Sequence, residues 1–587
     1  MLKTLGAHIK EFKLPSLLTP VFMILEVIME MIIPLLMASI IDDGVTPGNM
    51  NHILLIGGLM VLTALFSLTF GICGGVFGAK ASTGFARNLR RAMYENIQTF
   101  SFSNIDKFST SGLVTRLTTD VTNIQMAYQM LLRMCMRAPF SLIIAMFMSF
   151  RISSRLASVY LVAVLILACV LALIVSQAMK HFSQAFPKYD DLNESVQENV
   201  SAIRVVKAYV REEHENAKFK KASGNIYKIF CKAEGIVAWN SPVMNLTIYT
   251  CIILISWIGA HMIVEQSTMV DGFSIGQLTS LLAYCMNILM NLMMLSMIFV
   301  MMTMSAASAR RVCEVLKEKP DLANPEEPVY EVKDGSICFE NVSFSYKKDA
   351  DSAVLKNINL NIRSGETIGI IGGTGSAKSS LVNLISRLYD VTEGQLLVGG
   401  LDVRQYDMET LRNQVAVVLQ NNVLFSGTIL ENLRWGDKEA SEEECRKACE
   451  LACASEFIEK MPDGYNTYIE QGGTNVSGGQ KQRLCIARAL LKKPKILILD
   501  DSTSAVDTAT DAKIRKAFAE EIPGTTKLII AQRISSVEHA DRIIVMHEGE
   551  IDGFGTHEEL LASNEIYRDV YEAQTSGSGD FDEKGGE

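Results

Sequence analysis

The pattern of hydrophobic and polar positions divides the chain into two parts. Up to about residue 310, long apolar stretches alternate with polar links, whereas from Val329 onward short apolar runs alternate with helical patterns. Six stretches approach the roughly 20 apolar residues that a helix needs to cross a bilayer. They lie at 20–41, 53–77, 137–150, 157–177, 243–264 and 278–304. The pattern predicts an α-helical domain with six membrane helices, followed by an α/β domain.

The polar links differ in length and charge. Those at 42–51 and 261–273 are short, whereas those at about 78–132 and 179–241 are long and rich in Lys and Arg. Because basic links stay on the cytoplasmic side, we expect the long ones there, as helices that continue out of the membrane. Their tips, at 109–113 and 202–207, are either plain helix-hairpin turns or contacts with a cytoplasmic motor domain.

Five segments follow from this pattern. Residues 1–14, with three lysines among Leu and Phe, are expected to form an interfacial elbow helix. The transmembrane domain spans 15–310, and a linker rich in Pro and acidic residues spans 311–328. The α/β domain covers 329–574. The tail at 575–587, which is Gly, Ser and acid, is expected to be disordered.

Composition excludes several classes of protein. Hydrophobic residues make up 49% and charged residues 20% of the chain, which is too apolar for an ordinary soluble enzyme. This composition indicates membrane segments, so we expect a lipid bilayer around part of the chain. The net charge of −10 argues against nucleic acid as the main partner. The 12 cysteines are scattered without metal-ligand spacing, so we expect reduced thiols.

The strongest chemical signal is a Gly-rich loop between a strand-like run at 366–371 and a helix start at 381–385. Such a loop surrounds phosphate oxygens with backbone N–H groups at a helix N-terminus, as in a P-loop. Its residues are Gly372, Gly373, Thr374, Gly375, Ser376, Ala377, Lys378, Ser379 and Ser380. Lys378 would reach the β- and γ-phosphates of ATP, and Ser379 would ligate Mg²⁺. Ala377 replaces the last Gly of the motif, where its methyl group crowds the loop but leaves the N–H in place.

Further motifs surround this loop in the sequence. Asp500 ends the apolar run 496–499 and would hold the Mg²⁺ shell. Gln420 follows an apolar strand at 415–419, and Tyr346 offers a ring for adenine stacking. Ser477, Gly478, Gly479 and Gln480 precede a helix, so their hydroxyl and N–H groups suit a γ-phosphate. Residues 504–507 follow Asp500.

These motifs and their order resemble those of the ATP-binding cassette (ABC) transporters. Six membrane helices before one nucleotide domain are similar to an exporter half-transporter. The resemblance implies that the two hairpin tips are coupling helices and that Gln420 belongs to the Mg²⁺ and catalytic site. It also implies that each ATP lies between the P-loop and Asp500 strand of one subunit and the Ser477–Gln480 signature of the other.

The departures from the family pattern concern catalysis. Asp501 stands where the family has Glu to polarise the attacking water, and Gln532 stands where it has a switch-loop His. Gln can neither carry charge nor take up a proton. Residues 470–473 also differ from the usual G-E-R-G. One interpretation is drift in a working homodimer. The favoured one is a heterodimer with a second half-transporter, in which this chain resembles the degenerate-site subunit of bacterial multidrug exporters.

Candidate substrate contacts lie in the membrane helices. Glu26 and Glu30 share one helix face, and either line an inward cavity that favours cations or are satisfied by an Arg or by snorkelling. Methionines in the last span either pack or form an adaptable wall; they are Met286, Met290, Met293 and Met297, with Met294, Met301 and Met302 beside them. The leading function is ATP-driven export of amphipathic drugs or lipids. A dedicated peptide or lipid exporter and a non-pumping ATP-gated channel or regulator remain alternatives.

Overall fold

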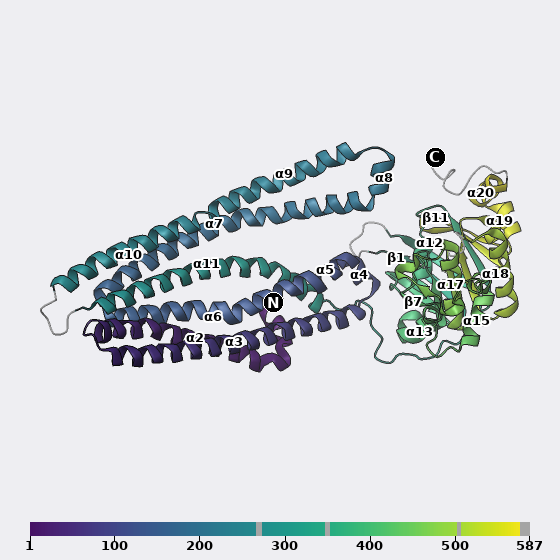
Figure 1. Ribbon diagram of the computed structural model, residues 1–587. Coiled ribbons are helices and arrows are strands. Elements are labelled where there is room, and N and C mark those ends of the chain that lie inside the picture. Colours follow the sequence, from purple (N-terminus) through teal and green to yellow (C-terminus); the bar gives the residue numbers. More distant parts are fainter. Residues whose placement is uncertain (266–272, 347–352, 502–505, 576–587) are drawn as a thin grey trace. The chain divides into compact units, whose positions relative to one another are not determined.

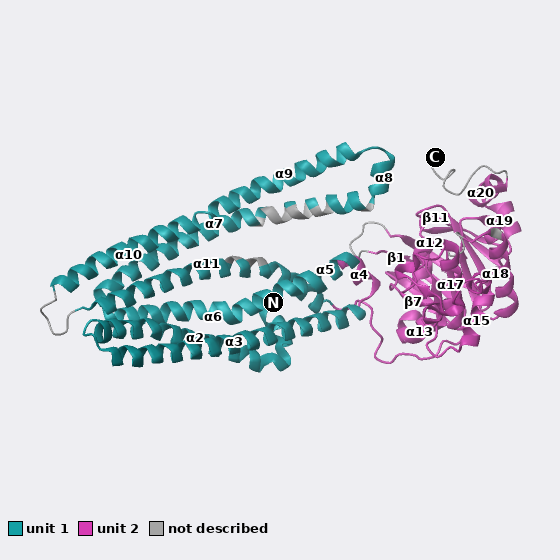
Figure 2. Ribbon diagram, in the orientation of Figure 1, with its two compact units in different colours: residues 1–99, 109–318 teal, residues 100–108, 319–587 magenta. Residues whose placement is uncertain are grey.

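The computed structural model describes residues 1–265, 273–346, 353–501 and 506–575. They form two compact units. One contains Met1–Thr99 and Ser109–Glu318, and the other contains Phe100–Phe108 and Lys319–Glu587, coloured separately in Figure 2. The first unit therefore ends at Glu318, within the expected linker. A short segment of the first long polar link, Phe100–Phe108, belongs to the second unit.

The first unit is built from long helices (Figure 1). The chain enters it through α1 (Leu2–Gly6) and a 3₁₀ segment at Ala7–Phe12, so the expected elbow is broken into two short pieces with a kink at Lys10. The helices that follow are α2 (Lys13–Ser39), α3 (Met50–Gln98), α5 (Thr110–Thr115), α6 (Val121–Ile152), α7 (Ser154–Ser201), α8 (Ile203–Ala208), α9 (Glu212–Val237), α10 (Asn240–Glu265) and α11 (Ile275–Lys317). Short π-helical turns at Ile40–Val45 and Arg116–Asp120 follow α2 and α5.

Six of these helical segments are long and apolar enough to cross a membrane, as the sequence predicts. The third differs from the expected 137–150, because α6 is one continuous helix from Val121 that carries Arg133 and Arg137 along its length. The long links are helical extensions, as expected: α3 runs on to Gln98, and α7 and α9 lie side by side with α8 joining them (Figure 1).

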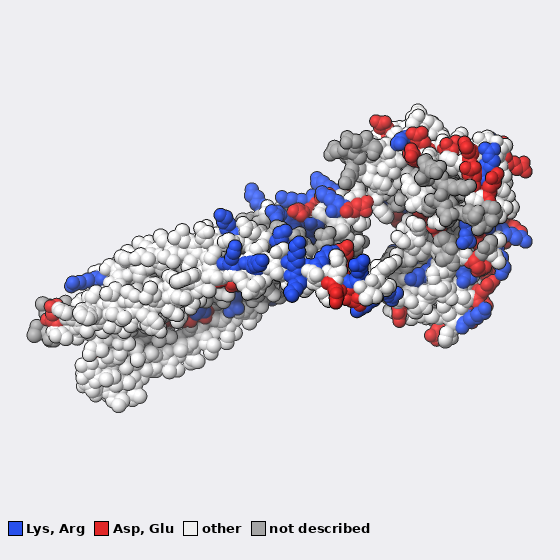
Figure 3. All heavy atoms as spheres, turned by 90° about the horizontal axis from the view of Figure 1, so that it is seen from above, with Lys and Arg blue, Asp and Glu red and all other residues white. Residues whose placement is uncertain are grey.

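Polar ties cross the apolar helix packing of the first unit. Tyr284 of α11 donates to the Met31 carbonyl of α2 at 2.6 Å, and Tyr160 of α7 donates to the Leu281 carbonyl at 2.8 Å. Both rings are buried, so each hydroxyl needs such a partner. Charge is distributed unevenly: the apolar part of this unit is almost free of charged atoms on the face in Figure 3, and Lys and Arg gather over its polar helical extensions. That distribution agrees with the membrane and cytoplasmic zones predicted from the sequence.

The second unit is an α/β domain with two main sheets. A six-stranded sheet has the order β12-β11-β3-β10-β9-β6, and β1, β2, β4 and β5 form an antiparallel sheet in the order β2-β1-β4-β5. The strands are β1 (Ile337–Phe344), β2 (Leu355–Ile362), β3 (Thr367–Gly372), β4 (Glu393–Val398), β5 (Leu401–Asp402), β6 (Val415–Val418), β7 (Gly427–Thr428), β8 (Tyr468–Ile469), β9 (Ile496–Asp500), β10 (Thr526–Ile530), β11 (Arg542–His547) and β12 (Glu550–Gly555). The predicted strands at 366–371, 415–419 and 496–499 correspond to β3, β6 and β9.

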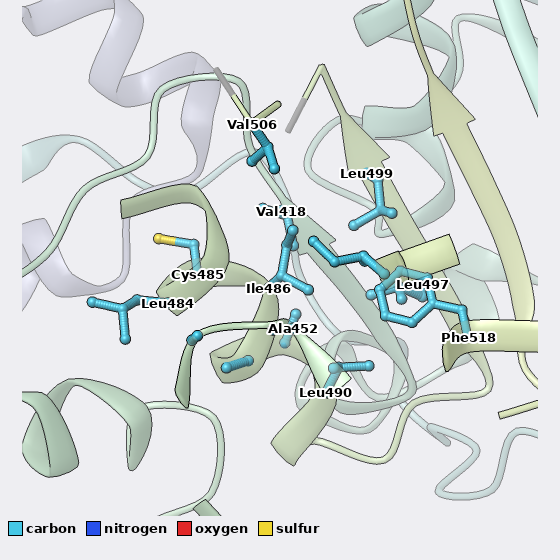
Figure 4. Close-up of a cluster of buried hydrophobic side chains, with 14 of the residues drawn as sticks. Val418, Ala452, Leu484, Cys485, Ile486, Leu490, Leu497, Leu499, Val506 and Phe518 are labelled. Atoms are coloured by element: carbon cyan, nitrogen blue, oxygen red, sulfur yellow. The ribbon is translucent and has the colours of Figure 1, made fainter. Parts of the chain in front are cut away.

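Helices fill the connections between these strands. They are α12 (Lys378–Ile385), α13 (Met408–Gln414), α14 (Ile429–Leu433), α15 (Glu442–Leu451), α16 (Ser455–Ile458), α17 (Gly478–Leu491), α18 (Thr508–Glu521), α19 (His557–Ser563) and α20 (Glu565–Thr575). Successive side chains of β9 point to opposite faces. Ile496 and Ile498 join a core with α12 and the antiparallel sheet. Leu497 and Leu499 join a second core with α17 and α18, part of which Figure 4 shows.

A short helix from the first long link, α4 (Phe102–Phe108), belongs to this second unit. The expected tip at 109–113 follows directly after α4 and forms the N-cap and first turn of α5 in the first unit. Polar side chains in and beside α4 bond to the rest of the second unit. Asp106 accepts a hydrogen bond from the Tyr389 hydroxyl at 2.9 Å, Ser101 and Ser103 bond to Asp321, and Asn104 donates to the Lys319 carbonyl.

Candidate active site

The predicted nucleotide motifs follow the carboxyl ends of adjacent parallel strands. β3, β10, β9 and β6 are neighbours, and Ile530 is in register with both Ile370 and Asp500. The P-loop follows β3, Asp500 and Asp501 lie at the end of β9, and Gln532 follows β10. The carboxyl edge of a parallel sheet is where such folds bind ligands. The sheet therefore brings together motifs that lie up to 160 residues apart, Gly372 to Gln532, in the sequence.

The P-loop closes around the ammonium group of Lys378. Its Nζ donates to the carbonyls of Gly372 at 2.7 Å and Gly373 at 2.8 Å. Gly375 has φ +86° and open space where a Cβ would lie, so the loop presents its backbone to the solvent side. Ala377 is the residue before α12 and adopts the left-handed conformation, with φ 70° and ψ 23°. The missing glycine is therefore replaced by an alanine that keeps a glycine-type backbone, at a cost of about 1 kcal/mol.

Asp500 and Ser379 face each other across the start of α12. The Asp500 carboxyl is buried, and this burial raises its pKa, while a hydrogen bond from Ser379 and the charge of Lys378 oppose the shift. A carboxylate beside a hydroxyl at the phosphate loop is the donor set that Mg²⁺ prefers, so these residues fit a Mg²⁺ ion bound with ATP. When bound, the ion neutralises charge on the phosphate oxygens.

Asp501 and Gln532 are in direct contact. The Gln532 amide donates to Asp501 Oδ2 at 3.1 Å, and the Asp501 N–H donates to the Ile530 carbonyl at 3.2 Å. Asp501 has φ 48°, a left-handed conformation that Asp tolerates better than most residues. The two residues at which the sequence departs from the family's catalytic pattern thus bond to each other. An amide cannot act as an acid or base, so this pair can hold a position but cannot exchange a proton through Gln532.

Tyr346 is partly exposed, which leaves its ring available for stacking with a base. Ser380 and Tyr389 hold it in place, and neither contact was predicted from the sequence. Its ring is 46% exposed, and its hydroxyl shares a hydrogen bond of 2.9 Å with Ser380 Oγ. Its edge meets Tyr389 at 5.1 Å between ring centroids. Ser380, which the sequence places in the phosphate loop, is buried, and its hydroxyl is the partner of Tyr346. Burial raises the pKa of the Tyr389 hydroxyl, which keeps it a donor toward Asp106 of α4.

Gln420 and the signature segment have exposed positions. Gln420 follows β6, and its carbonyl accepts from the Asn422 amide at 3.4 Å. Ser477 begins α17 with a complete capping box: its hydroxyl accepts from the Gln480 N–H, and the Gln480 side chain accepts from the Ser477 N–H. Gly478 and Gly479 form the first turn of α17. Of the predicted segment 504–507, residues 504 and 505 lie outside the described residues, and Asp507 caps α18 through the Thr510 N–H.

Comparison with known proteins agrees with these features. A family model described as the ABC transporter transmembrane region matches residues 17–293, and one described as ABC transporter matches residues 355–504. An uncharacterized ABC transporter ATP-binding protein of Bacillus subtilis is 36% identical over 568 residues, covering 97% of this chain and 98% of the relative. The chain belongs to the ABC transporters.

Two further similarities refine the architecture of this ABC transporter. It is 34% identical over 488 residues to an ATP-dependent lipid A-core flippase of Syntrophus aciditrophicus, covering 83% of this chain and 80% of the flippase. Its fold matches a bacterial Atm1-family ABC exporter solved with ATP bound, with a TM-score of 0.82, 22% identity and coverage of 96% and 99%. The chain is thus an exporter half-transporter, a multi-pass membrane protein with a C-terminal ATP-binding domain. Exporters of this family work as dimers in the bilayer and couple ATP hydrolysis to transport.

The membrane candidates of this ABC transporter occupy two places in the first unit. Arg137 of α6 donates to Glu26 at 2.8 Å and to both oxygens of Glu30 at 2.7 and 2.9 Å. An Arg partner, one of the two alternatives for these acids, is therefore present. On α11 the predicted methionines carry exposed side chains, with exposed fractions of 38% for Met286, 58% for Met290, 41% for Met293 and 66% for Met297.

Three residues near the ATP-binding elements had no signal in the sequence. Tyr389 and Asp106 are 283 positions apart, and Gln574 contacts the Gln532 carbonyl from 42 positions away. Each is a common polar residue outside any motif. Their roles depend on which elements the fold places beside them, and periodicity along one chain does not contain that information.

Proposed function

We propose that this ABC transporter chain is one subunit of a heterodimeric exporter that moves amphipathic compounds, drugs or lipids, out of the cell. Its own P-loop side forms a degenerate ATP site that binds ATP and hydrolyses it slowly. Its signature segment, Ser477–Gln480, completes the fast site on the partner subunit. The partner is a second half-transporter that has Glu and His where this chain has Asp501 and Gln532.

One observation carries this proposal: Asp501 and Gln532 are bonded to each other at the site where the family has a Glu and a His. The Asp carboxylate is about 1.5 Å shorter than a Glu carboxylate, because one methylene is missing. Losing a positioned base and proton-transfer group typically lowers a rate by roughly 10²-fold or more. ATP binding uses Lys378, Ser379, Asp500 and Tyr346, and none of these is altered, so ATP stays bound at a site that hydrolyses it slowly.

The two coupling tips also belong to the proposal. The tip around α4 contacts its own ATP-binding domain through Tyr389 and the linker before that domain through Asp321. The second tip, α8 with Arg204 and Lys207, exposes Ile203 and Val205 to 43% and 56%. We propose that it docks on the partner's ATP-binding domain near the residue equivalent to Gln420. In this chain the corresponding surface has a pocket of about 330 Å³ that Val423, Phe425 and Trp435 help to line.

The decisive experiment is the steady-state ATPase rate of the purified transporter, obtained by tagging this chain and isolating it with its partner from native membranes. Asp501→Ala should leave most of the activity, whereas removal of the partner's catalytic Glu should abolish it. A purified complex containing this chain alone, or complete loss of activity with Asp501→Ala, would mean two equivalent sites and overturn the proposal.

The proposed substrate is amphipathic because α11 exposes a Met face and α2 and α6 carry a charged cluster. Glu26, Glu30 and Arg137 bear a net charge of −1 when all three are ionised, and Glu26 Oε2 is buried without a hydrogen bond among the described residues. An ammonium headgroup would supply the missing donor. The lipid alternative is favoured by the flippase relative, which is named for moving a lipid.

Export assays in inverted vesicles distinguish these substrates from each other and the pump from a channel. Glu26→Gln with Glu30→Gln leaves Arg137 unpaired and can impair folding. The informative variant therefore also carries Arg137→Gln, which removes all three charges together. ATP-dependent uptake of cationic dyes should fall more than uptake of neutral dyes or a fluorescent phospholipid. An equal fall for all classes of dye and lipid would contradict the proposed preference for cations. Absence of any ATP-dependent uptake would favour the channel or regulator over the pump.

A further inference from the structure

The last described helix of the chain holds the loop that carries Gln532. Gln574, on the final turn of α20, places its side-chain amide between two backbone groups of that loop. Its Nε2 donates to the Gln532 carbonyl at 3.0 Å, and its Oε1 accepts from the Ile534 N–H at 2.9 Å. One side chain therefore fixes the backbone on both sides of Arg533.

α20 does not need Gln574 to stay in place. Tyr567, Val570 and Ala573 of the same helix are buried, and the Tyr567 hydroxyl bonds to His557 Nδ1 of α19 at 2.6 Å. These residues join α20 to the core of the domain, and Gln574 follows Tyr567 and Val570 along the same helix face, at the end nearest the loop. The amide can therefore hold the loop without being a main source of the helix's stability.

The loop leads directly to the ATP site. Ala531 is buried and its N–H donates to the Ile370 carbonyl of β3, so the chain leaves the sheet at Gln532. The Gln532 side chain then reaches Asp501 at 3.1 Å. The polar contacts form a series from α20 to the Gln532 backbone, and from the Gln532 side chain to Asp501. A group whose backbone is fixed before ligand arrives loses less entropy when it binds.

We infer that Gln574 is a positioning residue that holds the switch loop in its ATP-binding conformation, so that α20 sets how long ATP remains at this chain's site. The inference deepens the proposed function, because it takes this site to be the one that retains ATP. It assigns a regulatory role to the C-terminal helix, through a side chain that contacts the loop backbone and not the nucleotide.

The test uses the full-length transporter purified with its partner and 8-azido-ATP with Mg²⁺ as the probe. The probe is bound at 4 °C, chased with excess ATP for increasing times, and photo-activated. Gel separation of the subunits then reports the residence time on this chain alone. Gln574→Ala removes both hydrogen bonds, and two neutral hydrogen bonds of typical net strength correspond to about thirtyfold faster release. Gln574→Glu keeps an acceptor for the Ile534 N–H but sets a carboxylate oxygen against the Gln532 carbonyl, so it should also accelerate release.

Asp569→Ala is the matched control, since Asp569 is an exposed residue of the same helix. Hydrogen exchange provides a readout that general destabilisation would not reproduce: peptides covering 531–536 should exchange faster in Gln574→Ala, and those covering 557–570 should not. Unchanged release from Gln574→Ala, or equal acceleration by Asp569→Ala, would overturn the inference. This assay measures release of bound nucleotide and not its hydrolysis. If the ATPase assay contradicted the slow-site proposal, the effect of Gln574 on release could therefore still be judged by itself.

Discussion

Two helix N-termini in the ATP-binding domain belong to the predicted phosphate-binding motifs, and their local backbone geometry differs. α17 begins at Ser477, whose reciprocal hydrogen bonds with Gln480 form a complete capping box before two glycines. α12 begins after Ala377, which has no side-chain cap hydrogen bond and adopts a left-handed backbone. Both ends carry the partial positive charge of a helix dipole. The N-terminus of α17 is therefore capped without backbone strain, whereas the N-terminus of α12 includes a strained, left-handed alanine.

The difference extends to the catalytic groups. At the P-loop end, Asp501 and Gln532 replace the Glu and His of the family and bond to each other. At the signature end the Ser-Gly-Gly-Gln segment matches the family pattern. In the dimer that we propose, these two ends serve different ATP molecules. The comparison therefore teaches that departures within one chain can be confined to one of two ATP sites, and each prediction below changes one end and leaves the other intact.

The largest effect is expected from Ser477→Arg at the intact end. A long cation replaces the capping hydroxyl and occupies the space where the partner's bound γ-phosphate would lie. Steady-state ATPase of the purified heterodimer should fall by roughly 10²-fold, as for loss of a site that stabilises the transition state. Ser441→Arg serves as a control, because Ser441 forms the same kind of capping box at the start of α15. Comparable losses from both changes would indicate a folding defect.

The second effect concerns coupling from the altered end. Tyr346 packs against Tyr389, and Tyr389 donates to Asp106 of α4, which the chain places between α3 and α5. We therefore predict that ATP at this site influences the membrane domain even when it is hydrolysed slowly. Tyr389→Phe keeps the ring and removes the hydroxyl. One hydrogen bond to a charged group contributes about 1.5–3 kcal/mol.

Transport per ATP hydrolysed in reconstituted vesicles should fall severalfold, while ATP binding at Tyr346 should persist. Asp106→Asn should behave similarly, and the double variant should add little to either single change, because the two residues share one interaction. Tyr468→Phe, an exposed tyrosine on β8, is the control. Independent, additive losses would argue against a Tyr389–Asp106 connection.

The third prediction restores the altered end. Asp501→Glu combined with Gln532→His should create a second hydrolysing site and raise total ATPase by about twofold, because a base and a proton-transfer group return to positions that already bind ATP. The sharper readout adds Ser477→Arg to this double change. Because one of the two hydrolysing sites then remains, about half of the doubled activity should persist, whereas Ser477→Arg alone should leave almost none. If Ser477→Arg still abolishes activity, the restored residues do not form a competent site.

Much of this architecture could be predicted from the sequence, and the failures have a common physical cause. Hydrophobic runs located six membrane helices and the strands β3, β6 and β9, because burial leaves a periodic record in one chain. The P-loop and signature were readable because their glycines meet local backbone requirements. Three contacts could not be predicted from such patterns. They are the contact of α4 with Tyr389, the Ser380–Tyr346 hydrogen bond, and the Arg137 bridge between Glu26 and Glu30. Each depends on side chains brought together from distant segments.

The smallest effect tests the strain at Ala377. Ala377→Gly should stabilise the ATP-binding domain by about 1 kcal/mol, because glycine adopts φ 70° without the clash that Cβ suffers there. Thermal unfolding of the transporter without nucleotide measures this change. Ala452→Gly is a control of opposite sign: Ala452 is buried at φ −86°, so glycine adds freedom to the unfolded chain and also removes a methyl group from the core, and it should destabilise by about 1 kcal/mol or more. Because the strain lies in the P-loop and not in the catalytic pair, ATPase should stay within about twofold of the unaltered rate in Ala377→Gly. A large gain in turnover would place the defect of this site in its loop and not at Asp501 and Gln532.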